Sequence, residues 1–505
     1  MGLASGIKSN LFLAVVLGLV FCETPLCAQP PMRTVIIDAA APGHPFPHFW
    51  EQMFGSGRAI LTLREAWRRD ARDVKQITGF QYVRFHAILE DDLGVYDEDK
   101  NGKPIYNFSY VDQVYDGLLA LGIKPFVEIS FMPKKLASSP APFAFWDRPI
   151  VSPPKDYAKW EALITAFCNH LVERYGIDEV VSWYFEVWNE PNIDFWAGNP
   201  KQETYFELYD HTSRAIKAVN QRLRVGGPST AQAAWVDAMI AHAVTTNVPL
   251  DFVSTHVYGN DTSHDVFQTD ERIPRDQMVC RAVKKVHDQI KASQRPDMPL
   301  VWSEFNAAYD NDVRVTDTIY MGPFMASTIS QCDGLAKIMS YWSVSDVFDE
   351  QGVVKQPFYG GFGLIAAGGI PKAAFFAFEI LHYLGDQRIA NSSSDVLVTK
   401  AKNGALVLAA WNLVNPGETG SLKTLQLDFK GVSPTAEVSI ARVDEQHGDT
   451  LALYQKMGSP QYPTQARVQQ LRHESGLPSP EILHLSNGKL TLQLPVNGLA
   501  VIRVL

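Results

Sequence analysis

The sequence predicts an α/β fold in which a (β/α)8 TIM barrel is followed by an accessory C-terminal β-sandwich. Between about residues 46 and 387, short apolar runs alternate with longer segments of helical period, as in repeated strand–helix units around a parallel sheet. Beyond about residue 388, strict alternation of apolar and polar residues takes over, which is typical of antiparallel strands with one buried face. A chain of 505 residues also exceeds what one hydrophobic core usually organises.

Eight candidate strands follow one another in the first region, and helical periodicity fills the intervals between them. The strands are residues 49–54, 82–86, 125–130, 182–188, 224–227, 252–256, 300–304 and 338–342. Helical spacing of three or four is clear in Trp160, Leu163, Phe167, Leu171 and Tyr175, and again in Val279, Val283, Val286 and Ile290. Eight such units match a barrel over residues 46–387, with a doubly wound open sheet as the alternative.

The C-terminal region, residues 388–505, is predicted to form the β-sandwich. Its alternating runs include Leu425, Leu427 and Phe429, then Leu490, Leu492, Leu494 and Val496, with turn signals such as Asn487-Gly488 between runs. Residues 29–45 are expected to add one more strand to it. The sandwich has three possible roles: binding sugar, supporting the barrel, or building a homo-oligomer. We favour support, because no cluster of turn aromatics marks a binding module.

The N-terminus has the features of a secretory signal. Lys8 precedes an apolar run over residues 11–21, and Leu26-Cys27-Ala28 follows, so residues 1–28 are predicted to be a signal peptide cleaved near Ala28. The run is too short to span a bilayer, and a retained N-terminal anchor is the alternative interpretation. We therefore expect export to the periplasm or the cell exterior.

Composition excludes several classes of protein. With a net charge of -10 and no dense run of Lys or Arg, nucleic acid is not an expected partner. Apolar residues at 46% and charged residues at 20% indicate an ordinary globular chain. Cys168, Cys280 and Cys332, which follow the signal, form no disulfide framework, and no Cys/His cluster has metal-ligand spacing. Neither a metal nor an organic cofactor is expected.

The strongest motif is Trp-Tyr-Phe-Glu-Val-Trp-Asn-Glu-Pro-Asn at residues 183–192, a buried-strand pattern that ends in polar residues. Because the C-termini of barrel strands point into the mouth of the barrel, Glu190 would lie there, backed by Trp188. Apolar surroundings raise the pKa of a carboxyl group and suit a general acid. Asn189 would hydrogen-bond a sugar hydroxyl. The alternative is that Asn-Glu-Pro caps the following helix.

A second glutamate, Glu304, ends the predicted seventh strand, just as Glu190 follows the fourth. Glycosidases need two carboxyl groups flanking the scissile bond, so this pair predicts glycoside hydrolysis. Other polar or aromatic residues at strand ends are expected in the same mouth, namely His86, His256, Tyr258 and Trp342. Tyr258 would hydrogen-bond Glu304, and Trp342 would stack under the sugar. Glu350, after the eighth strand, is equally consistent with a binding role and with none.

Two further features are predicted to lie in loops. The acidic run of residues 90–92 is a solvated loop or part of the pocket rim, and the glycine-rich residues 360–363 are a turn, because they lack the spacing of a phosphate loop.

Taken together, these motifs resemble glycoside hydrolase family 39, the family of β-xylosidases and α-L-iduronidases. The resemblance rests on residues 185–192, on Arg84-Phe-His86 with Asp91-Asp92, on residues 254–258, on residues 303–306, and on residues 340–346 through Gly360-Gly361. It implies that Glu190 is the acid/base and Glu304 the nucleophile of a retaining mechanism. It also implies sugar contacts from His86, Asn189, His256, Tyr258, Trp342, Glu350 and, more loosely, Tyr309.

The function expected from this resemblance is removal of a terminal β-linked xylose from xylo-oligosaccharides, without a cofactor. An acidic protein suits a neutral sugar better than a uronic acid, and Lys355 is the one cation to consider near the pocket. The alternatives are another family 39 exo-glycosidase (α-L-iduronidase, β-glucosidase or arabinosidase type), an endo-glycanase of the same barrel superfamily, or an inactive carbohydrate-binding homologue.

Overall fold

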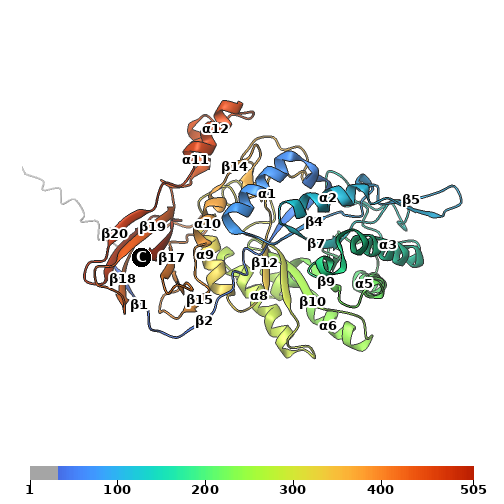
Figure 1. Cartoon of the computed structure of the whole chain (residues 1–505), viewed down its shortest axis with the longest axis horizontal. Coiled ribbons are helices and arrows are strands. Elements are labelled where there is room, and N and C mark those ends of the chain that lie inside the picture. Colours follow the sequence, from blue (N-terminus) through green and yellow to red (C-terminus); the bar gives the residue numbers. More distant parts are fainter. Residues whose placement is uncertain (1–31) are drawn as a thin grey trace, which may run out of the picture.

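The computed structural model describes residues 32–505, in which a closed barrel of parallel strands adjoins a β-sandwich (Figure 1). The predicted signal peptide lies outside the described residues. Within residues 32–505, no helix is both long and apolar enough to cross a membrane.

The barrel closes through eight parallel strands that neighbour one another in sequence order. They are β3 (Met53–Arg58), β4 (Tyr82–His86), β7 (Lys124–Ile129), β8 (Tyr184–Val187), β9 (Arg224–Thr230), β10 (Phe252–Tyr258), β11 (Leu300–Asn306) and β12 (Ile338–Tyr341). The predicted barrel is therefore confirmed, and the open doubly wound sheet is excluded.

The first strand was predicted four residues too early. Phe49 and Trp50 are buried, but they lie in a turn before the strand, whereas β3 continues through residues 55–58. This glycine-rich stretch resembles a loop in sequence. Glycine is required at residue 55 of this strand because a Cβ there would come within 2.1 Å of the Trp342 ring.

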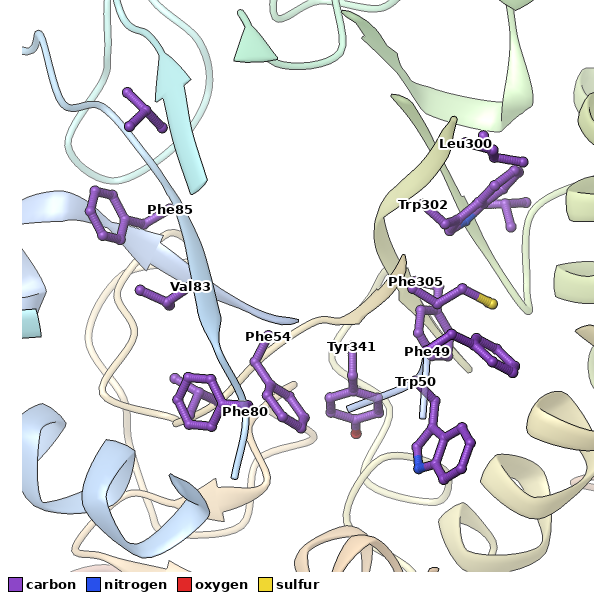
Figure 2. Close-up of a cluster of buried hydrophobic side chains, with 14 of the residues drawn as sticks. Phe49, Trp50, Phe54, Phe80, Val83, Phe85, Leu300, Trp302, Phe305 and Tyr341 are labelled. Carbon is purple, nitrogen blue, oxygen red and sulfur yellow. The ribbon is translucent and has the colours of Figure 1, made fainter. Parts of the chain in front are cut away.

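Helices cover the outside of the barrel and bury the outward-facing side chains of the strands. The main ones are α1 (Glu65–Thr78), α2 (Ser109–Ala120), α3 (Tyr157–Tyr175), α5 (Lys201–Val219), α6 (Val236–Thr245), α8 (Arg275–Ala292), α9 (Met321–Cys332) and α10 (Ala373–Leu381). Figure 2 shows Val83 and Phe85 of β4, and Trp302 and Phe305 of β11, pointing away from the barrel interior. The residues between them in the sequence are thereby left to face inward.

Register shifts in two strands alter this alternation near the mouth. Thr255 pairs with Trp302 while His256 pairs with Glu304, so Ser303 is an extra residue in β11. In the same way, Ser254 pairs with Pro228 and Thr255 with Thr230, which makes residue 229 extra in β9. Such bulges re-aim side chains next to active sites, and here they let consecutive polar residues take part in one inward network.

The sandwich consists of a seven-stranded and a three-stranded sheet. The large sheet has the order β2 (Gly43–Pro45), β15 (Gln387–Ile389), β16 (Val396–Lys400), β17 (Leu406–Trp411), β22 (Leu499–Val504), β19 (Glu437–Val443) and β20 (Glu481–His484). The small sheet is β1 (Arg33–Asp38), β18 (Lys423–Lys430) and β21 (Lys489–Leu494). Their facing side chains share one apolar core.

The outer face of the large sheet packs against barrel helices α9 and α10. Leu397, Val407, Ala409, Trp411 and Val501 belong to the same apolar cluster as the barrel core. Consequently β17 is buried at every position, while β21 keeps the alternating pattern that the sequence shows. The sandwich is thus joined to the barrel by a shared core.

Residues 450–474 depart from the predicted all-β character. They contain α11 (Thr450–Lys456) and α12 (Gln465–Glu474), inserted between β19 and β20. Leu451, Tyr454 and Leu471 bury their side chains against Phe358 and Ile370 of the loop region after β12. The two inserted helices therefore gain their stability from packing against the barrel. Their weak helical periodicity could not reveal this packing.

The sequence predicted no disulfide framework, and it did not reveal the disulfide bond that links two barrel helices. Cys280 of α8 and Cys332 of α9 form a disulfide, with their Cα atoms 5.3 Å apart, while Cys168 is a free, buried thiol. The two cysteines are 52 positions apart in the sequence. They meet because consecutive helices of the barrel pack side by side, as their many contacts show.

Candidate active site

A cavity of about 290 Å³ opens among residues from the carboxyl ends of the barrel strands. Eight of the nine predicted site residues line it: His86, Asn189, Glu190, Tyr258, Glu304, Tyr309, Trp342 and Glu350. The ninth, His256, lies directly behind Glu190. Residues up to 264 positions apart along the chain are thus brought to one hollow, because parallel strands of a barrel end at the same face.

Arg84 forms the charged centre of the floor below this cavity. Its side chain is fully buried, and its guanidinium nitrogens lie 2.5 Å from Glu186, 2.6 Å from Glu304 and 2.7 Å from Glu128. It also donates to Asn189 Oδ1 at 2.9 Å. Burial opposes its charge, but the three carboxylates more than compensate and raise the pKa of Arg84. One permanent cation therefore holds the nucleophile candidate and orients Asn189, leaving the Asn189 amide NH₂ for a ligand.

Hydrogen bonds around His256 determine where the proton of Glu190 lies. Ser303 Oγ donates its single hydrogen to Glu186 at 2.7 Å, so it accepts from His256 Nε2 at 3.0 Å. In a neutral imidazole Nδ1 is then an acceptor, and it lies 3.0 Å from Glu190 Oε1. Burial, followed by the charge of Arg84, lowers the pKa of His256 well below its ordinary value and keeps the ring neutral. The network therefore favours a protonated Glu190.

The two glutamates of the candidate pair are in different electrostatic surroundings. Burial, and then the charge of Glu304, raises the pKa of Glu190 well above its ordinary value. Burial also raises the pKa of Glu304, but Arg84, His86 and the Tyr258 hydroxyl oppose this rise. Tyr258 donates to Glu304 Oε2 at 2.6 Å. Glu304 thus loses its proton first and Glu190 keeps its own, which is the division of roles between a nucleophile and an acid.

Carboxylate oxygens of these two residues lie within 4.8 Å of each other, together with a ring nitrogen of His256. Three such groups resemble a metal ligand set. Arg84 already supplies the positive charge beside them, and both nitrogens of His256 have protein partners. The donor set is therefore satisfied by the protein itself.

His86 and Glu350 form the opposite side of the cavity. His86 Nδ1 bonds Glu128 at 2.8 Å, and its Nε2 lies 3.7 Å from Glu350 and 3.9 Å from Glu304. Burial and then the charge of Glu304 raise the pKa of Glu350 well above its ordinary value. Its Oε1 is buried and has no hydrogen-bond partner in the part of the chain that the structure describes. Glu350 is therefore placed to bond a ligand that enters the cavity.

Two aromatic rings occupy different depths of the cavity. Trp342 is buried, and its ring lies 4.9 Å from that of His86, measured between centroids. Tyr309 is 55% exposed and meets Tyr258 edge to face at the rim. Trp342 thus offers a ring at the floor and Tyr309 one at the entrance.

An apolar wall that the sequence analysis missed completes the cavity. Phe143, Phe145 and Phe195 line it, with the rings of Phe143 and Phe195 stacked at 3.6 Å. Phe143 and Phe145 lie in a long segment between β7 and α3, which carries no regular periodicity. Trp188, predicted to back Glu190, instead packs between Phe131 and Trp196 and does not line the cavity.

No lysine or arginine is among the cavity-lining residues of the described chain, and Lys355 is exposed to solvent outside it. Acidic residues do line it, including Asp261 beside Glu190, Glu304 and Glu350.

The loop after β12, which carries Glu350, is fixed by a buried ion triad. Lys372 Nζ lies 2.7 Å from Asp317 and 2.6 Å from Asp346, and it donates to the Gly361 carbonyl at 2.8 Å. A Cβ on Gly361 would come within 2.4 Å of Asp346, so the glycines of residues 360–363 make room for this triad. These glycines lie in an irregular loop with bends rather than in a regular turn, and they serve this structural purpose.

The helix-cap interpretation of Asn-Glu-Pro is wrong. Residues 191–195 form turns and residues 196–200 an irregular loop, and the next helix, α5, begins only at Lys201. Glu190 instead adopts a left-handed backbone with φ 44° and donates its N–H to the residue 229 carbonyl at 2.7 Å. Uncommon backbone conformations of this kind cluster at functional sites.

Comparison with known proteins agrees with this geometry. The model of the glycosyl hydrolases family 39 matches residues 33–482. A beta-xylosidase of Geobacillus stearothermophilus is 38% identical over 84% of this chain and 86% of its own length. A beta-xylosidase of Caldicellulosiruptor saccharolyticus is 34% identical over 90% of this chain and 94% of its own. The crystal structure of a monomeric beta-xylosidase from Caulobacter crescentus CB15 superposes with a TM-score of 0.85 at 33% identity, over 94% of this chain and 99% of that one.

Proposed function

The chain belongs to glycosyl hydrolases family 39, and from this premise we propose that it is a retaining exo-β-xylosidase. It would remove a terminal β-linked xylose from xylo-oligosaccharides or related glycosides. The observation that carries the proposal is the pair of buried glutamates, Glu190 and Glu304, facing one small cavity at the mouth of the barrel.

The separation of the two carboxyl groups supports retention of configuration. Retaining glycosidases hold them ~5–5.5 Å apart, and inverting ones ~6.5–9.5 Å, to leave room for water. Oxygens of Glu190 and Glu304 within 4.8 Å of each other fit the shorter range.

In the proposed cycle Glu304 attacks the anomeric carbon while Glu190 donates its proton to the departing glycosidic oxygen. This breaks the glycosidic bond and forms a glycosyl ester on Glu304. Glu190, now a carboxylate, then takes a proton from water, which attacks the ester, releases the sugar with its original configuration and returns Glu304 to its ionised form.

The shape and charge of the cavity support a neutral terminal sugar. A volume of about 290 Å³ suits one end of a chain better than a long polymer segment. A uronic acid needs a cation for its carboxylate, whereas the described residues that line this cavity include acidic side chains but no lysine or arginine. His86, Asn189, Glu350 and Trp342 would bond and stack the sugar, while Tyr309 and the phenylalanine wall would contact the group that leaves.

Purified enzyme incubated with a panel of aryl glycosides tests the substrate. We expect release from the β-xyloside at a kcat/KM at least tenfold above that for the β-glucoside and α-L-arabinoside, and none from the α-L-iduronide. NMR of the first product should show the β anomer. Preference for another sugar would replace xylose in the proposal, an initial α product would refute retention, and inactivity on every glycoside would leave only a binding protein.

We also propose that the enzyme is exported. The signal-like residues 1–28 and the disulfide between Cys280 and Cys332 both support a location outside the reducing cytoplasm. The mass of the enzyme recovered from outside the cytoplasm should correspond to a chain starting near residue 29. Recovery of the full-length chain from the cytoplasm alone would contradict export.

A further inference from the structure

A cluster of His48, Glu51 and His382 lies far from the active site in the described chain. His48 and Glu51 are in the turn between β2 and β3, where the chain enters the barrel, and His382 directly follows α10, where the chain leaves it. The strands on either side of this junction, β2 and β15, are paired with each other. The cluster thus joins the two ends of the barrel.

Both histidines direct a nitrogen at one carboxylate oxygen. Nδ1 of His48 lies 2.5 Å from Glu51 Oε1, and Nδ1 of His382 lies 2.9 Å from the same oxygen. One potential ligand atom from each residue lies within 4.8 Å of the others. Glu51 is only 3% exposed, and its second oxygen, Oε2, is buried with no hydrogen-bond partner among residues 32–505.

The hydrogen bonds of His48 determine which of its ring nitrogens faces Glu51. Its Nε2 lies 2.9 Å from the Leu384 carbonyl oxygen, which only accepts, so Nε2 carries the hydrogen. In a neutral ring Nδ1 then presents a lone pair to the carboxylate of Glu51. Two lone pairs at this distance repel unless a proton or a metal cation lies between them.

We propose that His48, Glu51 and His382 bind one divalent transition-metal ion of the zinc type. Two imidazoles and a carboxylate are a ligand set that zinc accepts in four-coordinate sites, with water in the remaining position. Histidine ligands commonly donate their other N–H to a backbone carbonyl, as His48 does. A metal ion would also give a function to Oε2 of Glu51, the oxygen without a partner in the described chain. Protons shared with Oε1 alone would not do so.

The geometry allows such an ion to enter. His382 has a side chain that is 43% exposed, so the cluster is reached from solvent. Ligand atoms ~2.0–2.2 Å from a tetrahedral zinc are roughly 3.3 Å apart, so the two N···O separations must widen by less than about 1 Å. No metal-ligand spacing is visible in the sequence because His382 lies 331 positions after Glu51. The ion would fasten the entry and exit of the barrel together.

Zinc titration of the full-length enzyme tests this site. The protein is purified without a histidine tag, treated with chelator, dialysed, and titrated with zinc chloride by calorimetry. We expect one zinc per chain with a Kd of about 10 μM or below, weakened at least tenfold by His382→Ala and by Glu51→Gln. His264→Ala is the matched control, because His264 has a side chain that is 71% exposed and lies apart from the cluster. It should leave the affinity unchanged.

Thermal unfolding and activity supply independent readouts. Zinc at 100 times its Kd should raise the Tm of the wild type by about 3 °C and that of His382→Ala by less than about 1 °C. Since the cluster lies outside the active site, His382→Ala should retain the wild-type kcat/KM without added metal. The proposal is overturned if the wild type binds no zinc below about 100 μM, if His382→Ala binds it as tightly as the wild type, or if His264→Ala loses as much affinity.

Discussion

The hydroxyl of Tyr258 is predicted to set the acidic limit of activity. It donates to Glu304 Oε2 at 2.6 Å in a buried site. Burial and then the charge of Glu304 raise the pKa of Tyr258, so it remains a donor across the working range. The hydrogen bond favours the ionised form of Glu304, which is the form that attacks. Tyr258→Phe removes this donor and nothing else, so the pKa of Glu304 should rise.

The size of the rise follows from the strength of the bond. A hydrogen bond to a charged group contributes ~1.5–3 kcal/mol, and one pKa unit corresponds to about 1.36 kcal/mol. The acid limb of the kcat/KM profile, which marks loss of the first proton from the coupled pair, should therefore move up by about 1 to 2 pH units. Below the midpoint of this limb, kcat/KM falls tenfold per pH unit, whereas its plateau value at higher pH is less affected by the substitution.

The assay is kcat/KM for an activated aryl xyloside between pH 3 and 9. Tyr309→Phe is the matched control, since this tyrosine also lines the cavity, yet it is 55% exposed and makes no bond to Glu304. Its acid limb should coincide with that of the wild type. A limb displaced by less than about 0.3 unit in Tyr258→Phe would refute the electrostatic reasoning. Equal displacement in both variants would assign the effect to the rim of the cavity instead.

Four further predictions concern protonation and stability. Glu190→Ala should slow glycosides with poor leaving groups by about 10²–10⁴ and activated aryl glycosides far less; equal losses would contradict its role as acid. Ser303→Ala frees His256 to donate from Nδ1 to Glu190 and should lower the alkaline limb of the kcat/KM profile by about 1 unit; an unmoved limb would disprove the tautomer assignment. Lys372→Met leaves two buried carboxylates unpaired and should cost about 3–5 kcal/mol, a Tm loss of roughly 3–5 °C by calorimetry. Replacing both Cys280 and Cys332 by Ser removes a 52-residue loop closure worth about 4 kcal/mol, so an unchanged Tm would show that the bond does not form.

The meeting of Glu190 and Glu304 in one cavity could be predicted from sequence because barrel topology converts a local pattern into a spatial one. Glu190 and Glu304 each follow an apolar strand pattern, and all parallel strands of a barrel end at one face. The same rule located His86, Tyr258 and Trp342.

No such rule predicts the charged floor around Arg84, although the sequence contains a signal for it. Arg84, Glu128 and Glu186 lie inside strands, each between apolar residues. A charge within a buried strand requires a partner, but periodicity does not say which strand supplies it. The bulge at Ser303 was also invisible, because it depends on the register between neighbouring strands.

The phenylalanine wall and the disulfide escaped prediction for a related reason. Phe143 lies in an irregular segment whose path is decided by tertiary packing. Cys280 and Cys332 become neighbours only once α8 and α9 are packed together.

The charges of the site support the division of roles proposed for Glu190 and Glu304. Five glutamates surround the cavity floor, namely Glu128, Glu186, Glu190, Glu304 and Glu350, and Arg84 pairs directly with three of them. Glu190 and Glu350 have no such cation, and burial together with the charge of Glu304 raises the pKa of each. Ionised Glu304 therefore keeps protons on both sides of the sugar, one for the departing oxygen and one for a hydroxyl. An anionic sugar would add a further negative charge to this floor, which supports the proposed preference for a neutral substrate independently of the relatives.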